Sequence, residues 1–508
     1  MHRPDASVVL ITVDGLNIAT VDAMLAESAL PNVQWMIDNG VRVRQAVSGY
    51  PTITYAQFTS IMTGLFAGHH GILGNKWFDR YSLTFRDYNT IATYRSVNQD
   101  FLAPTLYERL HEQMTVNIQS AIHRGVTRTI DNWMSGGVWW FFGKFQELDS
   151  IMPTRFEVIS DLANETGRWP VLIHAYHPAV DEIGHRRGPD SPQYRRAVRN
   201  ADRQIGRIRQ AVASAGMTDR TCFVLLSDHG FEPVPWENCF DLARWLRREH
   251  GLKVTNSAYD SELLEDRHRH FNQYDAVVIA GGNRRAVIHL RGPAGWFDLP
   301  TRDQVDRLLH SDSQGGRASL VEQTGIQLAA RRIEAPADSS VVELVSRHGV
   351  SRVTRRGEGD DKRYRYDVVD TDALGDWADD TLQAFIADGW HDSAQWLAAT
   401  IDSPYPDLVV QIAEMFDSAR AGDIALFSPD GWDFASHDRG GHGGVTRSDM
   451  LVPMIFVGPR LPKGRTIPVA RLVDVAPTIL HLIRGDEAQN PEPAFDGIDL
   501  TPQLIEAQ

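Results

Sequence analysis

Two pairs of Asp and His residues stand at spacings that suit metal coordination. Asp181 and His185 lie four positions apart in VDEIGHRRGP, so in a helical turn both side chains share one face and could reach one ion. Asp228 and His229 are adjacent in VLLSDHGF, where an apolar strand is expected to end and the backbone to turn. Carboxylate oxygen and imidazole nitrogen suit zinc and related metals. The structural alternatives are a solvated pair at a helix start and a turn with an N-capping Asp.

Two further positions extend this set. Asp14 follows an apolar run and precedes Gly in LITVDGLN, a common arrangement at strand ends. His442 lies in GGHGGVTRSDM, where glycines remove bulk near an ion, although such a segment also suits a surface loop and the chain has 19 histidines. Together the Asp and His groups are the residue types expected around two ions about 4 Å apart.

Thr54 in PTITYAQFTSIMTG is the candidate nucleophile. It precedes a predicted helix over 55–63, so its hydroxyl would lie at the positive end of that helix. A nearby metal would lower the pKa of this hydroxyl further. Thr is also a good N-cap, and three neighbouring hydroxyls remain rivals: Thr52, Thr59 and Ser60. Asn75 in HHGILGN could donate its amide to a charged oxygen, although Asn in a Gly-rich turn is often a turn residue.

Four short apolar runs would position these side chains: 7–13, 169–176, 221–227 and 452–458. Near-continuous apolar runs favour a parallel sheet that is covered on both faces. Helices are predicted between them, at 31–39 and at 191–215, where apolar residues recur every three or four positions. This alternation predicts a doubly wound α/β domain, in which ligands bind beyond the carboxyl ends of the strands. Asp14, Asp228 and His229 stand at such ends.

The stretch from about 235 to 435 has a different pattern. Residues 275–290 resemble a hairpin around Gly281 and Gly282, and 352–369 resemble a second one. Acidic helical patterns with three tryptophans follow: Trp377, Trp390 and Trp396. We therefore predict an inserted α+β cap domain that sets substrate specificity. The predicted boundaries are 1–235 and 436–508 for the catalytic core and 236–435 for the cap.

Length and charge narrow the functional classes. A chain of 508 residues suggests two to four domain-sized pieces. A net charge of −15 argues against stable nucleic-acid binding, but not against a small anionic substrate, because bound cations reverse the local field. Two cysteines do not indicate a disulfide framework. The sequence shows neither a secretory leader pattern nor eighteen consecutive apolar residues, so we expect a cytoplasmic protein without a membrane span; it does not indicate an oligomeric state.

The ordered motifs resemble the alkaline phosphatase superfamily, and within it the type I phosphodiesterase/nucleotide pyrophosphatase family. VDG, PTITY, TSIMTG, HHGILGN, VDEIGHRRGP, SDHG, GHGG and VDVAPTIL occur in the family's order, over roughly 7–235 and 436–502. The resemblance implies an alkaline-phosphatase-like fold, with a doubly wound, mostly parallel sheet and helices on both faces. GN followed by WFD also resembles the phosphonoacetate hydrolases of the same superfamily.

The resemblance also implies two zinc sites, although manganese or iron would suit the same ligands. One site would be formed by Asp181, His185 and His442. The other would be formed by Asp14, Asp228, His229 and the oxygen of Thr54. In this scheme Thr54 attacks phosphorus in line and forms a phospho-threonine intermediate, while Asn75 holds a non-bridging oxygen.

The chain departs from the diesterase pattern beside the nucleophile. That branch usually reads Thr-Phe-Pro-Asn-His, whereas this chain has Thr54-Tyr55-Ala56-Gln57-Phe58. Tyr55 keeps an aromatic ring that could stack on a base or an aryl leaving group, but the lost Pro-Asn-His leaves nucleotide specificity open. Asn17 also replaces an Arg that is common after the first Asp-Gly.

We therefore expect a two-metal phosphodiesterase or nucleotide pyrophosphatase that acts on a small phosphate ester or nucleotide. The alternatives are a phosphonoacetate-type C–P bond hydrolase, a phosphomonoesterase of the same superfamily, and a non-catalytic metal-dependent binding module. The C–P alternative needs a cationic clamp for the carboxylate of the phosphonate. The cap has many Arg and Lys residues that could supply it, including Arg284, Arg285, Arg352 and Lys362, but the sequence does not show where they point.

Overall fold

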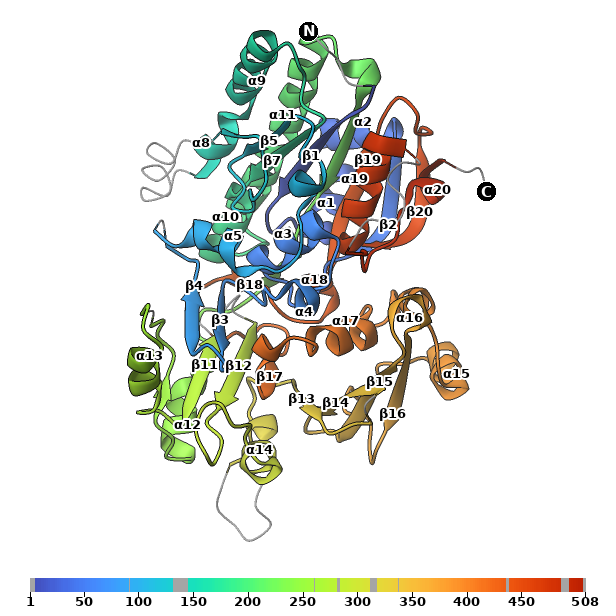
Figure 1. The fold of residues 1–508 in the computed structure, drawn as a ribbon. Helices are drawn as coiled ribbons and strands as arrows, with labels where there is room; N and C mark the ends of the chain where they lie inside the picture. The colour runs from blue at the N-terminus through green and yellow to red at the C-terminus, as the bar shows by residue number, and fades with distance from the viewer. Residues whose placement is uncertain are drawn as a thin grey trace.

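Two eight-stranded sheets organise the chain (Figure 1). The computed structural model describes residues 5–90, 92–130, 145–259, 261–280, 284–310, 318–336, 338–434, 438–485 and 493–505. The turn of the hairpin that we predicted around Gly281 and Gly282 lies outside these ranges. Within them, no helix combines the length and apolar character needed to span a membrane.

The first sheet has the strand order β20-β2-β19-β8-β1-β7-β5-β6. Its strands are β1 (Ser7–Val13), β2 (Val41–Val47), β5 (Thr115–Ile118), β6 (Arg128–Ile130), β7 (Leu172–His177), β8 (Thr221–Leu226), β19 (Leu451–Val457) and β20 (Arg465–Arg471). Neighbouring strands are parallel except for the pairs that β19 makes with β2 and β8. The predicted α/β class with a mostly parallel sheet is thus confirmed. The run at 452–458 forms a strand, but an antiparallel one, because a strand buried on both faces looks the same in either direction.

Helices cover both faces of this sheet because alternate side chains of each strand point to opposite sides. Val8 and Leu10 of β1 pack under one group of helices: α3 (Thr54–Thr63), α6 (Leu106–Arg109), α19 (Val475–Arg484) and α20 (Thr501–Ile505). Val9 and Ile11 pack under another: α1 (Ile18–Ala26), α2 (Pro31–Asp38), α9 (Met152–Thr166) and α11 (Pro192–Ser214). Helix α11 matches the helix predicted at 191–215, and Ser191 caps it by accepting a hydrogen bond from the Tyr194 N–H.

The second sheet has the order β10-β11-β12-β17-β13-β14-β15-β16. Its strands are β10 (Val254–Thr255), β11 (Ala276–Ala280), β12 (Arg285–Leu290), β13 (Leu328–Ile333), β14 (Ser339–Val345), β15 (Val350–Arg356), β16 (Arg363–Val368) and β17 (Ile424–Phe427). Apart from the parallel pair β10 and β11, neighbouring strands are antiparallel. The pairs β11–β12 and β15–β16 confirm the strand pairing of both predicted hairpins. The helices of this region are α12 (Leu242–Glu249), α13 (Leu264–Phe271), α14 (Arg302–Leu309), α15 (Asp380–Asp388) and α16 (Ser393–Thr400).

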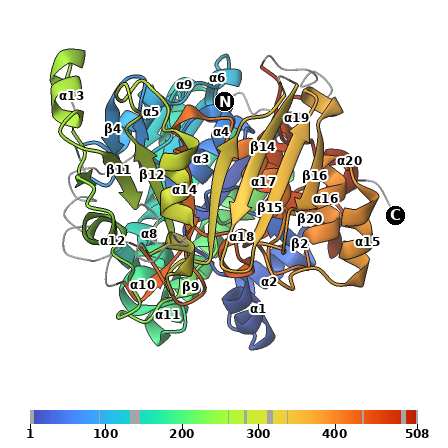
Figure 2. The same ribbon diagram turned by 90° about the horizontal axis from the view of Figure 1, so that it is seen from below.

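Short elements lie where the two sheets meet. They include α4 (Ala67–His70), α10 (Ala179–Arg187), α17 (Leu408–Met415), α18 (Arg447–Met450), and the two-stranded pair of β9 (Glu232–Pro233) and β18 (Gly440–Gly441). A second small pair is formed by β3 (Lys76–Asp79) and β4 (Thr84–Asp87). Helix α17 contacts β14, β15 and β16 on one side and α4 on the other. Figure 2 views the molecule from below, with the strands of the second sheet crossing in front of α17.

A buried ion pair joins α17 to the first sheet. Arg471, at the end of β20, donates from Nε and Nη2 to the two carboxylate oxygens of Asp407, each at 2.6 Å. Asp407 immediately precedes α17, and its side chain also accepts a hydrogen bond from Gln411. Both partners are buried, so a variant that removes one of them leaves the other charge without its partner.

We expect Asp407→Ala to lower the free energy of unfolding by about 3–5 kcal/mol, because the Arg471 guanidinium then stays buried and unpaired. The measurement is urea unfolding followed by circular dichroism. Asp22→Ala is the control, because Asp22 pairs with Arg42 at the surface and its loss costs at most about 1 kcal/mol. Equal losses in the two variants would contradict a structural role for the buried pair.

Candidate metal centre

The ends of adjacent strands bring together the first group of predicted ligands. Strands β1 and β8 are parallel neighbours with Thr12 opposite Leu226, so Asp14 and Asp228 emerge at the same edge of the sheet. The Nε2 atom of His229 lies 3.3 Å from Asp14 Oδ1 and 3.4 Å from Asp228 Oδ2. The backbone N–H of Gly15 donates to the other Asp228 oxygen at 3.2 Å.

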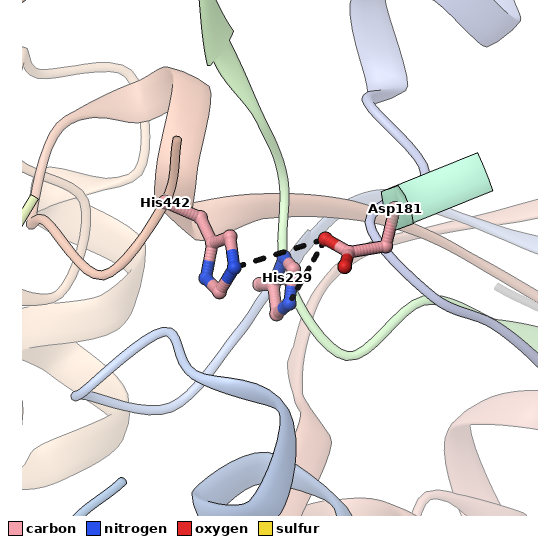
Figure 3. A group of neighbouring side chains, drawn as sticks. All are labelled: Asp181, His229 and His442. Carbon is pink, nitrogen blue, oxygen red and sulfur yellow. Dashed lines mark ion pairs between the residues drawn. The ribbon is translucent and has the colours of Figure 1, made fainter. Parts of the chain in front are cut away.

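A helix and a short strand supply the second group. Asp181 and His185 lie one turn apart in α10, and His442 directly follows β18. His185 Nε2 lies 3.5 Å from Asp181 Oδ1 and 3.2 Å from His442 Nε2. The Nε2 atoms of His442 and His229 lie 3.7 and 3.9 Å from the same Asp181 oxygen, as Figure 3 shows. The imidazole rings of His229 and His442 are stacked at 3.6 Å.

His229 therefore lies between the two groups. Its nitrogen falls close to Asp14 and Asp228, the set in which the resemblance placed it, and also close to Asp181 and His442. The six Asp and His side chains come from segments spread over more than 400 positions of the chain. The structure nevertheless places them in one continuous cluster beyond the carboxyl ends of the first sheet.

The carboxylates of the cluster have the character of a cation site. One oxygen each of Asp14, Asp181 and Asp228 is buried and has no hydrogen-bond partner among the described residues. Burial, and next the negative charge of Asp14, raise the pKa values of Asp181 and Asp228 well above their ordinary range. Buried carboxylates at this spacing repel one another unless cations or protons lie between them. The donor set thus fits two divalent ions.

Backbone carbonyls orient all three histidines toward the cluster. Nδ1 of His185 donates to the Gly440 carbonyl at 3.0 Å. In the same way, Nδ1 of His229 donates to the Gly230 carbonyl at 2.9 Å, and Nδ1 of His442 donates to the Thr52 carbonyl at 2.8 Å. A carbonyl only accepts, so these bonds place a proton on each Nδ1 and turn Nε2 toward the carboxylates. Metal-binding histidines are commonly fixed in this way. The sequence could not identify these partners, because any residue supplies a carbonyl.

Tyr176 is a contact of the cluster that sequence reasoning missed. Its hydroxyl donates to Asp14 Oδ2 at 2.5 Å, which leaves the other oxygen of Asp14 directed at His229. Tyr176 is on β7 and lies opposite Thr12 of β1. Thr12 stands two positions before Asp14 in the chain. It falls within a predicted apolar run, and only knowledge that β7 neighbours β1 would have indicated its role.

The geometry distinguishes Thr54 from its three rivals. Thr54 is the first residue of α3, and its hydroxyl lies 3.3 Å from His229 Nε2. The rival hydroxyls are bonded elsewhere: Thr52 to the Gly444 carbonyl, Thr59 to the Tyr55 carbonyl, and Ser60 to His70. Ile53 occupies the N-cap position of α3, without a side-chain capping bond. The N-cap explanation of Thr54 is therefore wrong.

Asn75 and Tyr55 lie beside Thr54. Asn75 Oδ1 accepts a hydrogen bond from the Tyr55 backbone N–H at 3.3 Å, so the donor end of its amide stays available. The Tyr55 ring is half-buried and tilts against Tyr88, with ring centres 5.3 Å apart. Its hydroxyl donates to the Tyr88 carbonyl at 3.4 Å.

Arg284 and Arg285 do not point outward as a clamp for a substrate. Arg284 is buried and faces the carboxylates of Asp430, Asp449 and Glu232. Arg285 is buried as well and donates to the Leu73 carbonyl at 2.7 Å. Both guanidinium groups are thus engaged inside the protein, and neither is directed at a substrate carboxylate.

A second Asp/Glu/His group, at the contact between the sheets, lacks the character of a metal site. His69, Glu414 and Asp417 approach one another closely. Two cationic side chains already lie among them, since Lys362 donates to Glu414 at 2.8 Å and Arg355 donates to Asp417. The carboxylates of this group are therefore neutralised by protein cations.

Comparison with known proteins was consistent with these observations. The family described as type I phosphodiesterase / nucleotide pyrophosphatase matches residues 8–449. An uncharacterized pyrophosphatase/phosphodiesterase of Schizosaccharomyces pombe is 26% identical over 255 residues, which cover 48% of this chain and 50% of that protein. Human ectonucleotide pyrophosphatase/phosphodiesterase family member 7 is 27% identical over 220 residues, which cover 40% of this chain and 44% of that protein. The chain thus spans about half the length of the curated relatives it matches.

Solved structures support the fold over nearly the whole chain. Murine ectonucleotide pyrophosphatase / phosphodiesterase 5 has a TM-score of 0.57 at 15% identity, with 94% of this chain and 95% of that chain covered. An inactive threonine-to-alanine variant of that murine protein, in complex with AMP, gives the same score. At this identity the likeness concerns the fold, and it confirms the predicted alkaline-phosphatase-like architecture.

We expect Tyr176→Phe to weaken divalent-metal binding, with zinc as the probe, by about 10-fold or more, because it removes the hydroxyl that orients Asp14 while keeping the ring. The measurement is zinc occupancy by elemental analysis in chelator-buffered zinc. Tyr107→Phe is the matched control, because the buried Tyr107 hydroxyl has no hydrogen-bond partner within the described ranges. Wild-type zinc affinity in Tyr176→Phe would exclude an orienting role.

Proposed function

Because the chain belongs to the type I phosphodiesterase/nucleotide pyrophosphatase family, we propose that it is a metal-dependent hydrolase of phosphodiester or pyrophosphate bonds in small substrates such as nucleotides. The observation that carries this proposal is the hydroxyl of Thr54, which lies 3.3 Å from His229 Nε2 at the edge of the Asp and His cluster. A hydroxyl placed against a divalent metal site is the arrangement that nucleophilic attack on phosphorus requires.

Seven residues would hold the two ions: Asp14, Thr54, Asp181, His185, Asp228, His229 and His442. Zinc suits the mixed carboxylate and imidazole set best, and manganese or iron would also be accepted. When bound, such ions neutralise charge on the phosphoryl oxygens and favour the ionised form of a nearby hydroxyl. The unpartnered oxygens of Asp14, Asp181 and Asp228 support this assignment.

In the proposed reaction Thr54 is the nucleophile. Its oxygen forms a bond to phosphorus and gives up the hydroxyl proton, while the bond from phosphorus to the leaving oxygen breaks and that oxygen takes up a proton. Water then cleaves the threonine phosphate and restores the hydroxyl. Asn75 donates its amide N–H to a non-bridging oxygen as charge develops there. The inactivity of the threonine-to-alanine variant of the murine relative supports a nucleophilic threonine.

We further propose that residues 236–435 act as a cap over a catalytic core formed by 1–235 and 436–508. The separate second sheet, whose strands fall between 254 and 427, supports this division. Tyr55 is exposed in part beside the nucleophile and is our candidate for contact with a base or an aryl group.

We expect Thr54→Ala to lower turnover of bis-p-nitrophenyl phosphate by at least about 1,000-fold, because the rival hydroxyls are bonded elsewhere. Zinc content should stay near the wild-type value, since the six Asp and His ligands remain. Thr59→Ala, in the same helix, is the control and should keep turnover near the wild-type rate. Turnover that survives in Thr54→Ala would remove this residue from the mechanism.

We expect the metal-replete protein to prefer bis-p-nitrophenyl phosphate over p-nitrophenyl phosphate by about 10-fold or more in kcat/KM, which corresponds to about 1.4 kcal/mol. A monoester dianion carries one more negative charge than the diester. Arg284 and Arg285 would not neutralise it, because they are held inside the protein by Asp449 and by the Leu73 carbonyl. The initial release of p-nitrophenol from each substrate measures the preference. A large preference for the monoester would reject the diesterase assignment.

A further inference from the structure

Arg284 is a buried cation close to the proposed centre. It lies just before β12 of the second sheet, and its side chain is 0% exposed. Its guanidinium faces three carboxylates from three different segments: Asp430 at 2.9 Å, Asp449 at 3.3 Å and Glu232 at 3.6 Å. We propose that Arg284 is a positioning residue that fixes the segments carrying His229 and His442 relative to each other. This inference deepens the proposed function and rests on it.

The first connection leads from Arg284 to His442. The Arg284 backbone N–H donates to the His442 carbonyl at 2.9 Å. Its side chain faces Glu232 of β9, and Glu232 stands opposite Gly441 in the pairing of β9 with β18. Gly441 is the residue immediately before His442. Arg284 thus holds the His442 segment both directly and through the strand that pairs with it.

The second connection leads from Arg284 to His229. The buried carboxylate of Asp449 faces the Arg284 guanidinium, and the Asp449 carbonyl accepts a hydrogen bond from the Gly230 N–H at 2.8 Å. Gly230 in turn supplies the carbonyl that fixes His229 Nδ1. A Cβ atom at Gly230 would lie 2.0 Å from the Ser448 carbonyl oxygen, so the two segments are already in close backbone contact.

Charge explains why the guanidinium matters for this geometry. Burial raises the pKa of Asp449 to about 6, while the positive charge of Arg284 acts in the opposite direction. Without Arg284, the buried carboxylate of Asp449, the largely buried one of Glu232 and the more exposed one of Asp430 would lose the cation that now lies among them. Their repulsion would separate β9 from α18, and the imidazoles held by these segments would move relative to the fixed carboxylate of Asp181.

The second sheet contains a matched control. Arg331 of β13 is also a buried guanidinium among carboxylates, since it pairs with Glu343 at 2.5 Å and with Asp306. Arg331 and Glu343 lie in the neighbouring strands β13 and β14, and Asp306 lies in α14. None of these residues belongs to the proposed centre. Arg331→Met therefore reproduces the loss of a buried guanidinium without touching the segments that carry His229 and His442.

The experiment compares Arg284→Met, Arg284→Lys and Arg331→Met in the full chain. Zinc affinity is determined by elemental analysis in chelator-buffered zinc, and thermal unfolding is followed in excess chelator. We expect Arg284→Met to weaken zinc binding by about 10-fold or more. Arg284→Lys keeps the positive charge but loses the planar set of guanidinium donors, so we expect it to weaken zinc binding less. Arg331→Met should lower the unfolding temperature and keep wild-type zinc affinity.

Wild-type zinc affinity in both Arg284 variants would overturn the proposal, and so would an equal loss of zinc affinity in Arg331→Met. If Arg284→Met does not fold, Arg284→Lys alone decides, because it retains the positive charge among the carboxylates. Zinc binding is measured without substrate. A wild-type protein that binds zinc but hydrolyses no diester would therefore count against the proposed function and leave the role of Arg284 intact.

Discussion

The mutual repulsion of three buried carboxylates is the constraint on which the site depends. Asp14, Asp181 and Asp228 each have one buried oxygen without a hydrogen-bond partner among the described residues, and all three oxygens lie within 3.9 Å of His229 Nε2. Such a cluster costs free energy unless cations balance it, so the surrounding structure must hold it in place. Burial lowers the pKa of His229, but the carboxylates of Asp228, Asp14 and Asp181 outweigh this effect and raise it to about 10. The same negative field that favours a proton on His229 favours divalent cations.

The fold meets this constraint by placing the charged groups on or directly after regular elements. Asp14 and Asp228 lie within two residues of the ends of the neighbouring parallel strands β1 and β8, and Asp181 lies in the first turn of α10. Each histidine is fixed through Nδ1 by a backbone carbonyl, so its ring cannot rotate away without losing a hydrogen bond. The Thr54 hydroxyl projects from the first residue of α3, which is buried against the first sheet.

The sequence predicted these features to the extent that they are local. Strand ends that terminate in Asp14 and in Asp228, and the one-turn spacing of Asp181 and His185, can be recognised from periodicity and spacing. The antiparallel direction of β19 could not be, because it depends on the order of the strands in the sheet. The contact of Tyr176 with Asp14 depends on the same long-range pairing. Thr54 could be separated from Thr52 only once the partners of both hydroxyls were known.

The second sheet reaches the centre through its own backbone and side chains. Arg285 donates to the Leu73 carbonyl two positions before Asn75, and Arg284 binds the carbonyl of His442. Arg285, the first residue of β12, thus contacts the segment that would stabilise the phosphoryl oxygen, and Arg284, just before it, contacts a segment that would hold a metal. A region that only covered the substrate would need contacts with the substrate alone. Because these contacts reach the segments around Asn75 and His442, the second sheet helps to hold the geometry of the proposed centre.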